Sequence, residues 1–354
     1  MKIDNQMNEI TIRRPDDWHV HLRDGAMLEA VLPYTARQFG RAIVMPNLVV
    51  PVTTSALASD YRRKILKALP DEKVFKKFIP LMTCYLTDET SVSDIGQGYA
   101  DGVFTAAKLY PANATTNSAH GVTNINALNA VFEKMQDIGM PLLVHGEETD
   151  PEVDIFDREA VYIDRVLTLL TQKFPKLKII MEHVTTKDAV DFVRTQKNQV
   201  AATITAHHLM LNRNDIFQGG IHPHLYCLPI AKREFHRLAL REAATSGDTC
   251  FFLGTDTAPH PLSDKEASCG CAGIFTAANA LELYTQVFDE ENALEKLEGF
   301  TSLYGSTFYG MGLNEGHVTL VREKFRIPGT IPVSDGSSIR PFRAGQTLGW
   351  KFKY

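Results

Sequence analysis

Short apolar runs rich in β-branched residues recur along this chain, and each ends in polar residues before a longer stretch begins. In the longer stretches, apolar positions are spaced by three or four residues, which is typical of amphipathic helices. The runs predict strands at Trp18–Leu22, Ala42–Pro46, Phe78–Leu86, Val103–Tyr110, Pro141–His145, Lys178–Val184, Val200–His207 and Cys250–Thr255. The clearest helical stretches are Asn124–Ile138, Ile155–Phe174 and Lys232–Ser246. Gly139 and Gly247 stand where two of these helices should end.

Alternation of eight strands with helices predicts an α/β protein with a closed parallel (β/α)8 barrel, the TIM barrel. The first strand ends near residue 21 and the eighth near residue 256, so the seven intervals average about 34 residues, which suits a strand–helix–strand unit. The alternative is an open doubly wound sheet, but no Gly-x-Gly-x-x-Gly follows the first strand. Residues 1–17 are too few for a separate β domain, so we expect one domain over 1–354. We expect its C-terminal extension to contain a helix at Ile274–Phe288 and a Pro/Gly-rich tail that wraps the barrel.

Composition narrows the class of protein without naming an activity. Hydrophobic residues make up 44% of the chain and charged residues 22%, as in ordinary soluble proteins. The apolar runs are too short to span a bilayer, and residues 1–17 lack a signal-peptide core, so we expect a cytoplasmic location. Five cysteines give no disulfide framework and fit a reducing compartment. A net charge of −5 without a basic block predicts neither a nucleic-acid nor a membrane partner.

Candidate chemistry lies at the ends of the predicted strands, where barrel enzymes place their active sites. The first strand carries His19 and His21, whose side chains project from one face at the spacing that two ligands of one metal need. The alternative is a pair of core histidines bonded to the backbone. His222 and His224 have the same spacing, but they lie in a Gly/Pro-rich loop, so we interpret that pair as structural or superficial.

A lysine, Lys108, lies near the end of the fourth strand between apolar neighbours. Burial lowers the pKa of an amine, and a neutral amine can add carbon dioxide to give a carbamate that bridges two cations. Alternatively, this lysine points outward or pairs with Asp256, at the end of the eighth strand.

His145 and His183 end the fifth and sixth strands. A lone histidine at a strand end is most often a core residue. Four histidines, a lysine and an aspartate at the ends of five strands together favour a zinc site with two ions bridged by water or hydroxide.

These motifs resemble the class II dihydroorotases of the amidohydrolase superfamily, from about residue 10 to the C-terminus. The matching segments are Asp17-Trp-His-Val-His-Leu-Arg-Asp-Gly25, Met45-Pro-Asn47, Lys108-Leu-Tyr-Pro111, Leu225-Tyr-Cys-Leu-Pro229, Gly254-Thr-Asp-Thr-Ala-Pro-His260, Ser268-Cys-Gly-Cys-Ala-Gly273 and Arg340-Pro-Phe-Arg-Ala-Gly-Gln-Thr-Leu-Gly-Trp350. A small departure is His222, where the family commonly has an arginine. This position lies outside the expected site.

The resemblance implies a (β/α)8 barrel, commonly in a homodimer, with two Zn2+ ions per subunit. It implies that His19, His21 and Asp256 hold the more buried ion. His145 and His183 would hold the second, and Lys108, as N6-carboxylysine, would bridge both together with hydroxide. The implied substrate contacts are Arg23, Asn47 and His260 for the carboxylate, the side chain of His145, and backbone groups at Leu228 and Ala272.

The implied reaction is the reversible cyclisation of N-carbamoyl-L-aspartate to L-dihydroorotate plus water, in de novo pyrimidine (UMP) synthesis. In the hydrolytic direction the bridging hydroxide attacks the ring amide carbonyl while the second zinc polarises it. Asp256 acts first as general base and then as general acid. Anionic substrates need a fixed cation, and Arg23 offers a planar fork for a carboxylate. The alternative for Arg23 is a salt bridge to Asp24 or Asp17.

The segment Pro111–His120 is small and polar, so we expect a loop that is mobile without ligand. The resemblance implies a lid whose Thr115 and Thr116 hydroxyls reach bound substrate. The alternative is a solvated loop without a role.

Other interpretations stay open at this point. The chain could be another cyclic-amide hydrolase, such as a hydantoinase or an allantoinase, or a catalytically silent barrel that serves as a scaffold. Cys269 and Cys271 form a weak zinc motif, and we favour loop cysteines around a turn at Gly270. We interpret His207 and His208, at the end of the seventh predicted strand, as packing residues or as supports for the ligands.

Overall fold

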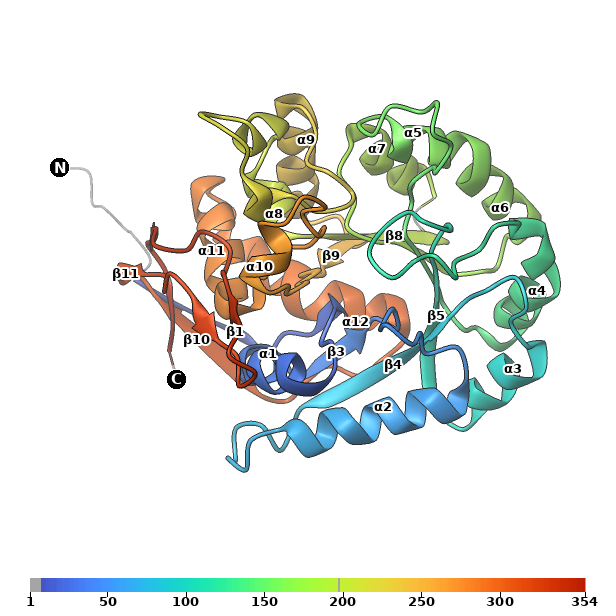
Figure 1. Cartoon of the computed structure of the whole chain (residues 1–354), viewed down its shortest axis with the longest axis horizontal. Coiled ribbons are helices and arrows are strands. Elements are labelled where there is room, and N and C mark those ends of the chain that lie inside the picture. The colour runs from blue at the N-terminus through green and yellow to red at the C-terminus, as the bar shows by residue number, and fades with distance from the viewer. Residues whose placement is uncertain (1–7, 197, 354) are drawn as a thin grey trace.

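Eight parallel strands form one sheet in the order in which they occur along the chain (Figure 1). The structure is a computed structural model that describes residues 8–196 and 198–353. The strands are β2 (Asp17–Val20), β3 (Arg41–Val44), β4 (Ile79–Tyr85), β5 (Phe104–Leu109), β6 (Leu142–Val144), β7 (Ile179–Met181), β8 (Val200–Ile204) and β9 (Phe251–Leu253). The last strand meets the first through a parallel bridge between Val20 and Thr257. Two backbone bonds support it, from His21 N to Thr257 O and from Asp256 N to His19 O. The predicted (β/α)8 barrel is confirmed.

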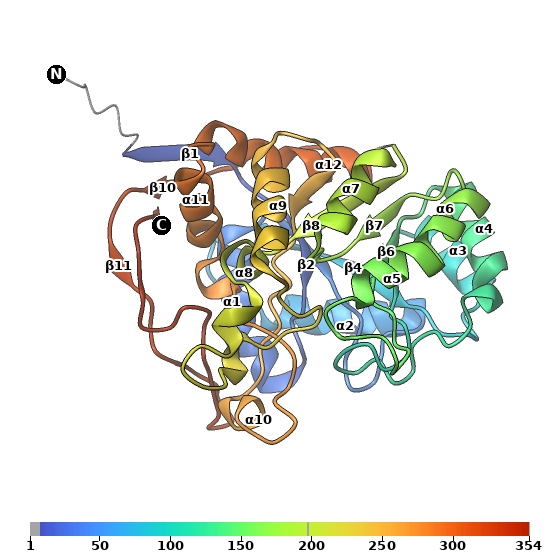
Figure 2. The same ribbon diagram turned by 90° about the horizontal axis from the view of Figure 1, so that it is seen from above.

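Most of the helices surround the barrel on its outer face (Figures 1 and 2). The described helices are α1 (Gly25–Gln38), α2 (Ser55–Ala68), α3 (Val92–Ala100), α4 (Asn129–Ile138), α5 (Arg158–Tyr162), α6 (Thr168–Lys173), α7 (Lys187–Thr195), α8 (Ala206–Met210), α9 (Glu234–Thr245), α10 (Leu262–Lys265), α11 (Ala280–Glu290) and α12 (Tyr304–Tyr309). A π-helical turn, Ile163–Leu167, joins α5 to α6, so the stretch predicted as one helix is continuous from Arg158. Gly139 ends α4 with φ at 71°, in the left-handed region that favours glycine.

Two predicted boundaries were wrong for identifiable reasons. The seventh predicted strand extended to His207, but β8 ends at Ile204 because the Thr205 side chain accepts a bond from His208 N and starts α8. The helix predicted from Ile274 starts only at Ala280. Ile274 instead forms a bridge with Thr257, as Phe275 does with Pro341. A helix cap ends β8 early, and a tertiary contact keeps Ile274 out of the helix that the local pattern predicts.

The segments at the two ends of the chain meet on the outside of the barrel. β1 (Glu9–Arg13), β10 (His317–Val321) and β15 (Lys351–Lys353) form an antiparallel sheet with β10 in the centre. Two further strand pairs continue the tail, β11 (Phe325–Arg326) with β14 (Thr347–Leu348) and β12 (Ile331–Pro332) with β13 (Ser338–Ile339). The tail packs against α1 and α11 on one side of the barrel and does not encircle it, and part of it is strand (Figure 2).

An aromatic cluster fills the barrel at the amino ends of its strands. Trp18 stacks on Tyr309 of α12 at a centroid distance of 4.4 Å, and Phe252 packs edge-on against Trp18. A Cβ on Gly305 would lie 2.0 Å from Trp18 Nε1, so this close approach of α12 requires glycine. Because this end is packed, the carboxyl ends of the strands are left for a site.

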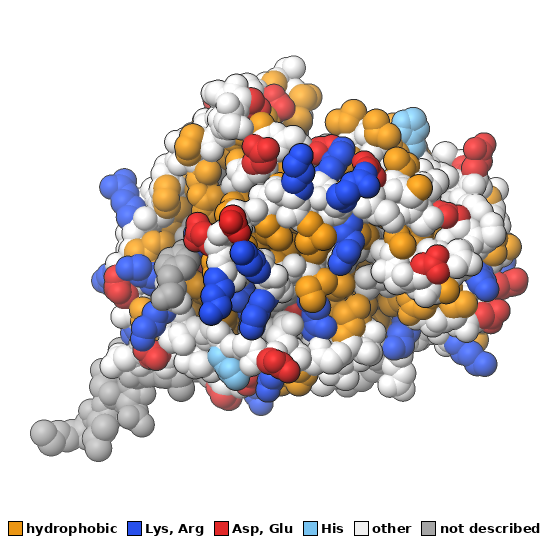
Figure 3. All heavy atoms as spheres, turned by 90° about the horizontal axis from the view of Figure 1, so that it is seen from below, with side chains coloured by type: hydrophobic (Ala, Val, Ile, Leu, Met, Phe, Trp, Pro, Cys, Tyr) orange, Lys and Arg blue, Asp and Glu red, His pale blue; other side chains and the backbone are white. Residues whose placement is uncertain are grey.

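Two surface properties bear on the predicted partners. Among the described residues, no helix combines the length and the apolar character that crossing a bilayer requires. On the face in Figure 3, acidic and basic side chains are interspersed, without a broad area of one sign.

Candidate metal centre and substrate pocket

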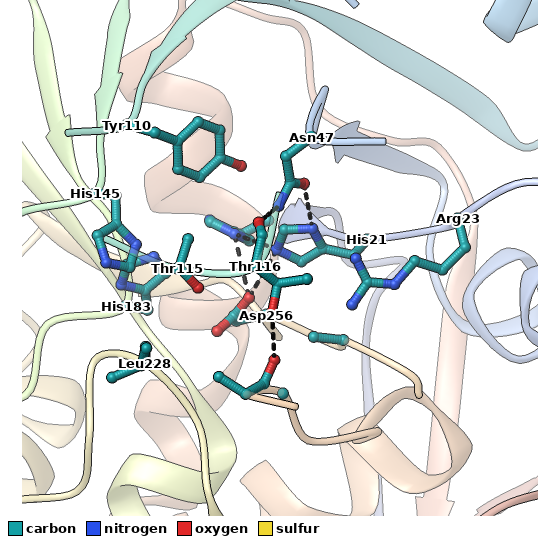
Figure 4. Close-up of a pocket in the computed structure, with 14 residues that line it drawn as sticks. His21, Arg23, Asn47, Tyr110, Thr115, Thr116, His145, His183, Leu228 and Asp256 are labelled. Atoms are coloured by element: carbon teal, nitrogen blue, oxygen red, sulfur yellow. Dashed lines mark hydrogen bonds and ion pairs between the residues drawn. The ribbon is translucent and has the colours of Figure 1, made fainter. Parts of the chain in front are cut away.

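Three predicted ligands, His19, His21 and Asp256, meet at the carboxyl ends of the first and last barrel strands. Figure 4 labels His21 and Asp256 of this group. His19 lies on β2 and His21 just beyond it, while Asp256 follows β9. Asp256 Oδ1 lies 3.3 Å from His19 Nε2 and 3.1 Å from His21 Nε2, and the two Nε2 atoms are 3.3 Å apart. All three side chains are buried. Two imidazoles and a carboxylate in this arrangement could hold one divalent metal ion.

The second ring nitrogen of each of these histidines, Nδ1, has a hydrogen-bond partner. His19 Nδ1 lies 2.7 Å from Glu182 Oε2, and His21 Nδ1 lies 2.8 Å from Asn47 Oδ1. Each Nδ1 therefore carries the proton, which leaves Nε2 as the ligand atom. Burial opposes ionisation of His19, but the Glu182 and Asp256 carboxylates outweigh it and raise the pKa of that imidazole. Burial lowers the pKa of His21 to about 4.

His145 and His183 form a second pair of candidate ligands beside the first group. Their ring centroids are 4.8 Å apart, and His183 lies 5.0 Å from the ring of His19. His145 Nε2 lies 2.8 Å from Glu147 Oε2, which leaves Nδ1 available. Nδ1 of His183 is buried without a hydrogen-bond partner among the described residues. Burial lowers the pKa of both imidazoles, so both are neutral and able to bind a metal.

Lys108 points into the barrel from β5, and its side chain is fully buried. Within residues 8–196 and 198–353, its Nζ has no hydrogen-bond partner, so the alternative of an outward-pointing or Asp256-paired lysine was wrong. Burial lowers the pKa of this amine to about 8. A buried amine that has no hydrogen-bond partner among the described residues and lies near imidazoles and a carboxylate fits a carbamate that bridges two ions.

Backbone strain is concentrated at this site. Arg23, His183 and Asp256 have φ values of 62°, 43° and 44°, in the left-handed region that residues with a side chain rarely adopt. The His183 conformation is stabilised by a bond from its N–H to Thr203 Oγ1 at 2.7 Å. Such strain persists where the surrounding contacts fix it, and functional sites are its commonest location.

A cavity of about 20 Å³ lies over these groups. It is lined by His19, His21, Arg23, Asn47, Tyr110, Thr115, Thr116, His145, His183, Leu228, Asp256, Ala258, Ala272 and Gly273. The lining includes the predicted ligands apart from Lys108 and the predicted substrate contacts apart from His260. His260 lies just behind the cavity, with Nε2 at 3.0 Å from both Arg23 Nη2 and Ala272 O.

Arg23 provides a positive charge at the cavity wall. Its Nε donates to Pro259 O at 3.1 Å. The alternative of a salt bridge with Asp24 or Asp17 was wrong, because Asp24 pairs with Lys64 and Asp17 accepts from Thr255. Among the described residues, no carboxylate lies within ion-pair distance of this guanidinium, so it can accept an anionic ligand.

The segment Pro111–His120 lies over the cavity in this structure. Asn47 Nδ2 donates to Thr116 O at 3.0 Å, and Thr116 Oγ1 donates to Ala272 O at 3.3 Å. Within the segment, Ser118 Oγ accepts from Thr115 N and donates to Thr115 O. A volume of about 20 Å³ admits little more than one water, so a ring substrate requires this segment to move.

Three residues around the site were not predicted. Glu147 orients His145 from two positions along the chain, in His145-Gly-Glu147. Glu182 stands beside His183 in the sequence but orients His19 of the first strand. Lys265 is the third. Its Nζ donates to the carbonyl oxygens of Tyr226, Cys271 and Gly273 at 2.8, 2.6 and 2.9 Å. It thereby joins the loops that carry Leu228 and Ala272, and no local motif marks it.

The motifs interpreted as structural behave accordingly. His224 Nε2 contacts Glu266 at 2.9 Å, and His222 Nε2 contacts Gln218 O. Cys269 is exposed and is not in a disulfide, with Gly270 at a φ of +53° in the turn that follows it.

The amidohydrolase family matches residues 16–320. The chain belongs to this family. It is 58% identical to the dihydroorotase of Erythrobacter litoralis over 97% of this chain and 99% of that protein. The dihydroorotase of Yersinia pseudotuberculosis serotype O:1b is also 58% identical, over 98% of this chain and 99% of that protein.

Solved structures agree with this grouping. Dihydroorotase from Campylobacter jejuni superposes with a TM-score of 0.90 at 35% identity, covering 100% of both chains. The dihydroorotase of Saccharomyces cerevisiae, in complex with 5-fluoroorotic acid, gives the same score and identity over 98% of this chain and 99% of that one. L-Hydantoinase from Arthrobacter aurescens, at 16% identity and a TM-score of 0.80, covering 97% of this chain and 83% of that one, shares the fold. The chain therefore groups with the dihydroorotases of the amidohydrolase family.

Proposed function

We propose that this protein interconverts L-dihydroorotate and N-carbamoyl-L-aspartate, the cyclisation step of pyrimidine synthesis. The observation that carries the proposal is the Arg23 guanidinium on the same cavity as the candidate metal ligands, with no carboxylate partner in the described part of the chain. The ligand set supports hydrolysis of an amide, and the cation supports an anionic substrate. The high identity to proteins named dihydroorotase supports the same assignment.

The residues fit a pair of zinc ions. His19, His21 and Asp256 would hold one ion, and His145 and His183 the other. Lys108, carboxylated on its buried amine, would be shared between them. When bound, such ions lower the pKa of water and act as Lewis acids toward a carbonyl oxygen.

Asp256 is suited to move the proton of the reaction. Burial would raise the pKa of this carboxyl, but its contacts with the His19 and His21 imidazoles outweigh burial and hold the pKa well below its ordinary value. The carboxylate is therefore ionised and can take a proton from water, then return it to the ring nitrogen that leaves.

Arg23, Asn47 and His260 would bind the substrate carboxylate, with His145 and the backbone at Leu228 and Ala272 around the ring. Asn47 Nδ2 donates one of its two N–H groups to Thr116 O, and the other would donate to the carboxylate. Ring closure converts a dianion into a monoanion and consumes one proton. Acid should therefore favour dihydroorotate and alkali carbamoyl aspartate.

The direct test is metal content and turnover of dihydroorotate, hydantoin and allantoin, for the native protein and Lys108→Ala. We expect about two ions per native chain, a preference for dihydroorotate, and loss of both ions and turnover in the variant. Lys178→Ala is the matched control, because that Nζ contacts Phe308 O at the packed end of the barrel. Full activity of Lys108→Ala, or preferred turnover of hydantoin or allantoin, would contradict the proposal.

The family resemblance also supports a cytoplasmic homodimer. Sedimentation of the native protein tests the dimer, and a mass of one chain at assay concentration would argue against it.

A further inference from the structure

We infer that this protein has a further metal site, distinct from the centre described above, formed by His207, His208 and Cys227. Two of these residues lie on α8, and the third lies in the loop that carries Leu228. Their ligand atoms all lie within 4.8 Å of one another. The inference does not depend on the proposed reaction.

Burial separates this cluster from ordinary surface histidines and cysteines. The exposed fractions of His207, His208 and Cys227 are 0%, 2% and 2%. None of the three lines the cavity over the metal centre. The cluster therefore lies inside the protein, behind the wall of the substrate pocket.

His207 provides the observation that points to a ligand. Both of its ring nitrogens are buried, and neither has a hydrogen-bond partner among the described residues. A buried imidazole ordinarily satisfies at least one nitrogen, since leaving it unpaired costs the desolvation of that group. The ring of His207 instead lies 4.5 Å from that of His208, centroid to centroid.

His208 Nε2 and Cys227 Sγ both lie within hydrogen-bond distance of Pro229 O, and a metal ion would replace these two bonds. Cys227 Sγ lies 3.5 Å from His208 Nε2, and Pro229 O lies 2.9 Å from that nitrogen and 3.4 Å from the sulfur. On the far side of the ring, Nδ1 is 2.8 Å from Thr205 Oγ1. With its proton on Nδ1, His208 would donate to Thr205 and present Nε2 to a metal, the arrangement that fixes ligand histidines elsewhere.

The donor set selects the class of ion. One thiolate and two neutral imidazoles suit Zn2+ or Co2+ and do not suit Mg2+ or Ca2+, which take oxygen ligands. Binding converts the Cys227 thiol to a thiolate and moves the His208 proton from one ring nitrogen to the other. One proton is therefore released for each divalent ion bound, and no oxidant or reductant is needed.

A metal here would join α8 to the loop Cys227–Pro229. Leu228 in that loop lines the substrate cavity, so the ion would fix one wall of the pocket from behind. Because the metal would bind the folded chain and not the unfolded one, adding metal should also raise the melting temperature.

The test uses protein that carries Cys269→Ser and Cys271→Ser, which remove the thiols of the Ser268–Gly273 loop, and whose catalytic centre alone is loaded with metal. This protein is titrated with Co2+. Because the proposed catalytic centre contains no sulfur ligand, a thiolate-to-cobalt charge-transfer band in the near ultraviolet reports this site alone. We expect one additional ion per chain that survives gel filtration, the band, and one proton released per ion.

Three variants in that background make the result decisive. Cys227→Ser should lose the band and the additional ion while keeping the other metals, and His207→Asn should lose the ion although its thiol remains. Cys84→Ser, a buried cysteine whose Sγ contacts Thr53 O, should behave as the parent does. A parent that takes up no additional ion, or a band that persists in Cys227→Ser, would overturn the inference.

Discussion

His19 Nδ1 donates to Glu182 Oε2 across 2.7 Å, which links the first barrel strand to the residue that follows β7. The same carboxylate oxygen accepts from Thr203 Oγ1 at 2.6 Å. The orientation of a metal-binding imidazole is thus set by a residue distant in sequence. At the second candidate ion site, Glu147 Oε2 likewise contacts a ring nitrogen of a ligand histidine, Nε2 of His145.

Glu182→Gln should weaken the ion held by His19, His21 and Asp256, because a neutral amide polarises the imidazole less than a carboxylate does. We expect a loss of roughly 10–100-fold in metal affinity, measured by competition with a chelator. Glu147→Gln should instead weaken the ion of His145 and His183. Glu266→Gln, on an exposed ion pair with His224, is the control. Native affinity for both ions in Glu182→Gln would argue against the role of this carboxylate.

Arg23→Met should impair turnover of dihydroorotate because it removes the charge that faces the substrate carboxylate. Loss of one partner of a buried charged pair costs about 2–5 kcal/mol, which corresponds to a fall in kcat/KM of roughly 30-fold or more. Any activity on a neutral ring such as hydantoin should change much less. An equal fall for charged and neutral rings would show that Arg23 does not recognise charge.

The double variant Thr115→Val and Thr116→Val tests the segment over the cavity. If the hydroxyls contact bound substrate, turnover should fall about tenfold or more, since each lost hydrogen bond costs about 1 kcal/mol. Metal content should not change. Thr195→Val, whose hydroxyl bonds Phe192 O on an exposed helix, is the control. Unchanged kinetics of the double variant would refute the lid role.

Lys265→Met should raise KM more than it lowers kcat, because it releases the loops of Leu228 and Ala272 from a shared ammonium. We expect a KM increase of about tenfold from the loss of three hydrogen bonds to a charged donor, with metal content retained. Lys232→Met is the matched control, because that buried Nζ donates to Ile230 O, within its own segment, and joins no loops of the pocket among the described residues.

The pH profile separates positioning by Lys265 from a general loss of structure. Burial lowers the pKa of Lys265 to about 8. Above that pH the amine loses its charge, so native KM should rise through pH 8 while KM of Lys265→Met stays flat. Parallel profiles would contradict this role.

Glu282→Gln should change the pH dependence of stability at a place remote from the site. Burial raises the pKa of Glu282 to about 7, above its ordinary 4.5. The folded chain therefore holds a proton that the unfolded chain releases above pH 4.5, and stability falls as pH rises from about 4.5 to 7. The difference between those pKa values corresponds to about 3 kcal/mol in the free energy of unfolding.

Urea unfolding of native protein and Glu282→Gln at pH 5 and pH 8 measures this effect. From pH 5 to pH 8, the free energy of unfolding of the variant should rise relative to that of the native protein. A difference between the two proteins that is independent of pH would rule out titration of Glu282.

The sequence by itself determined that the chain forms a barrel and which polar side chains lie at the carboxyl ends of its strands. Apolar strand patterns are local, and closure of a parallel barrel brings every strand's carboxyl end to one rim, so His19, Lys108, His145, His183 and Asp256 had to converge. The tertiary structure alone decided which ring nitrogen each histidine leaves free, that Lys265 joins two loops, and that His207 and His208 lie on a helix beside Cys227. These relationships depend on hydrogen bonds and packing between segments far apart in the chain, and a local pattern of residues carries no record of them.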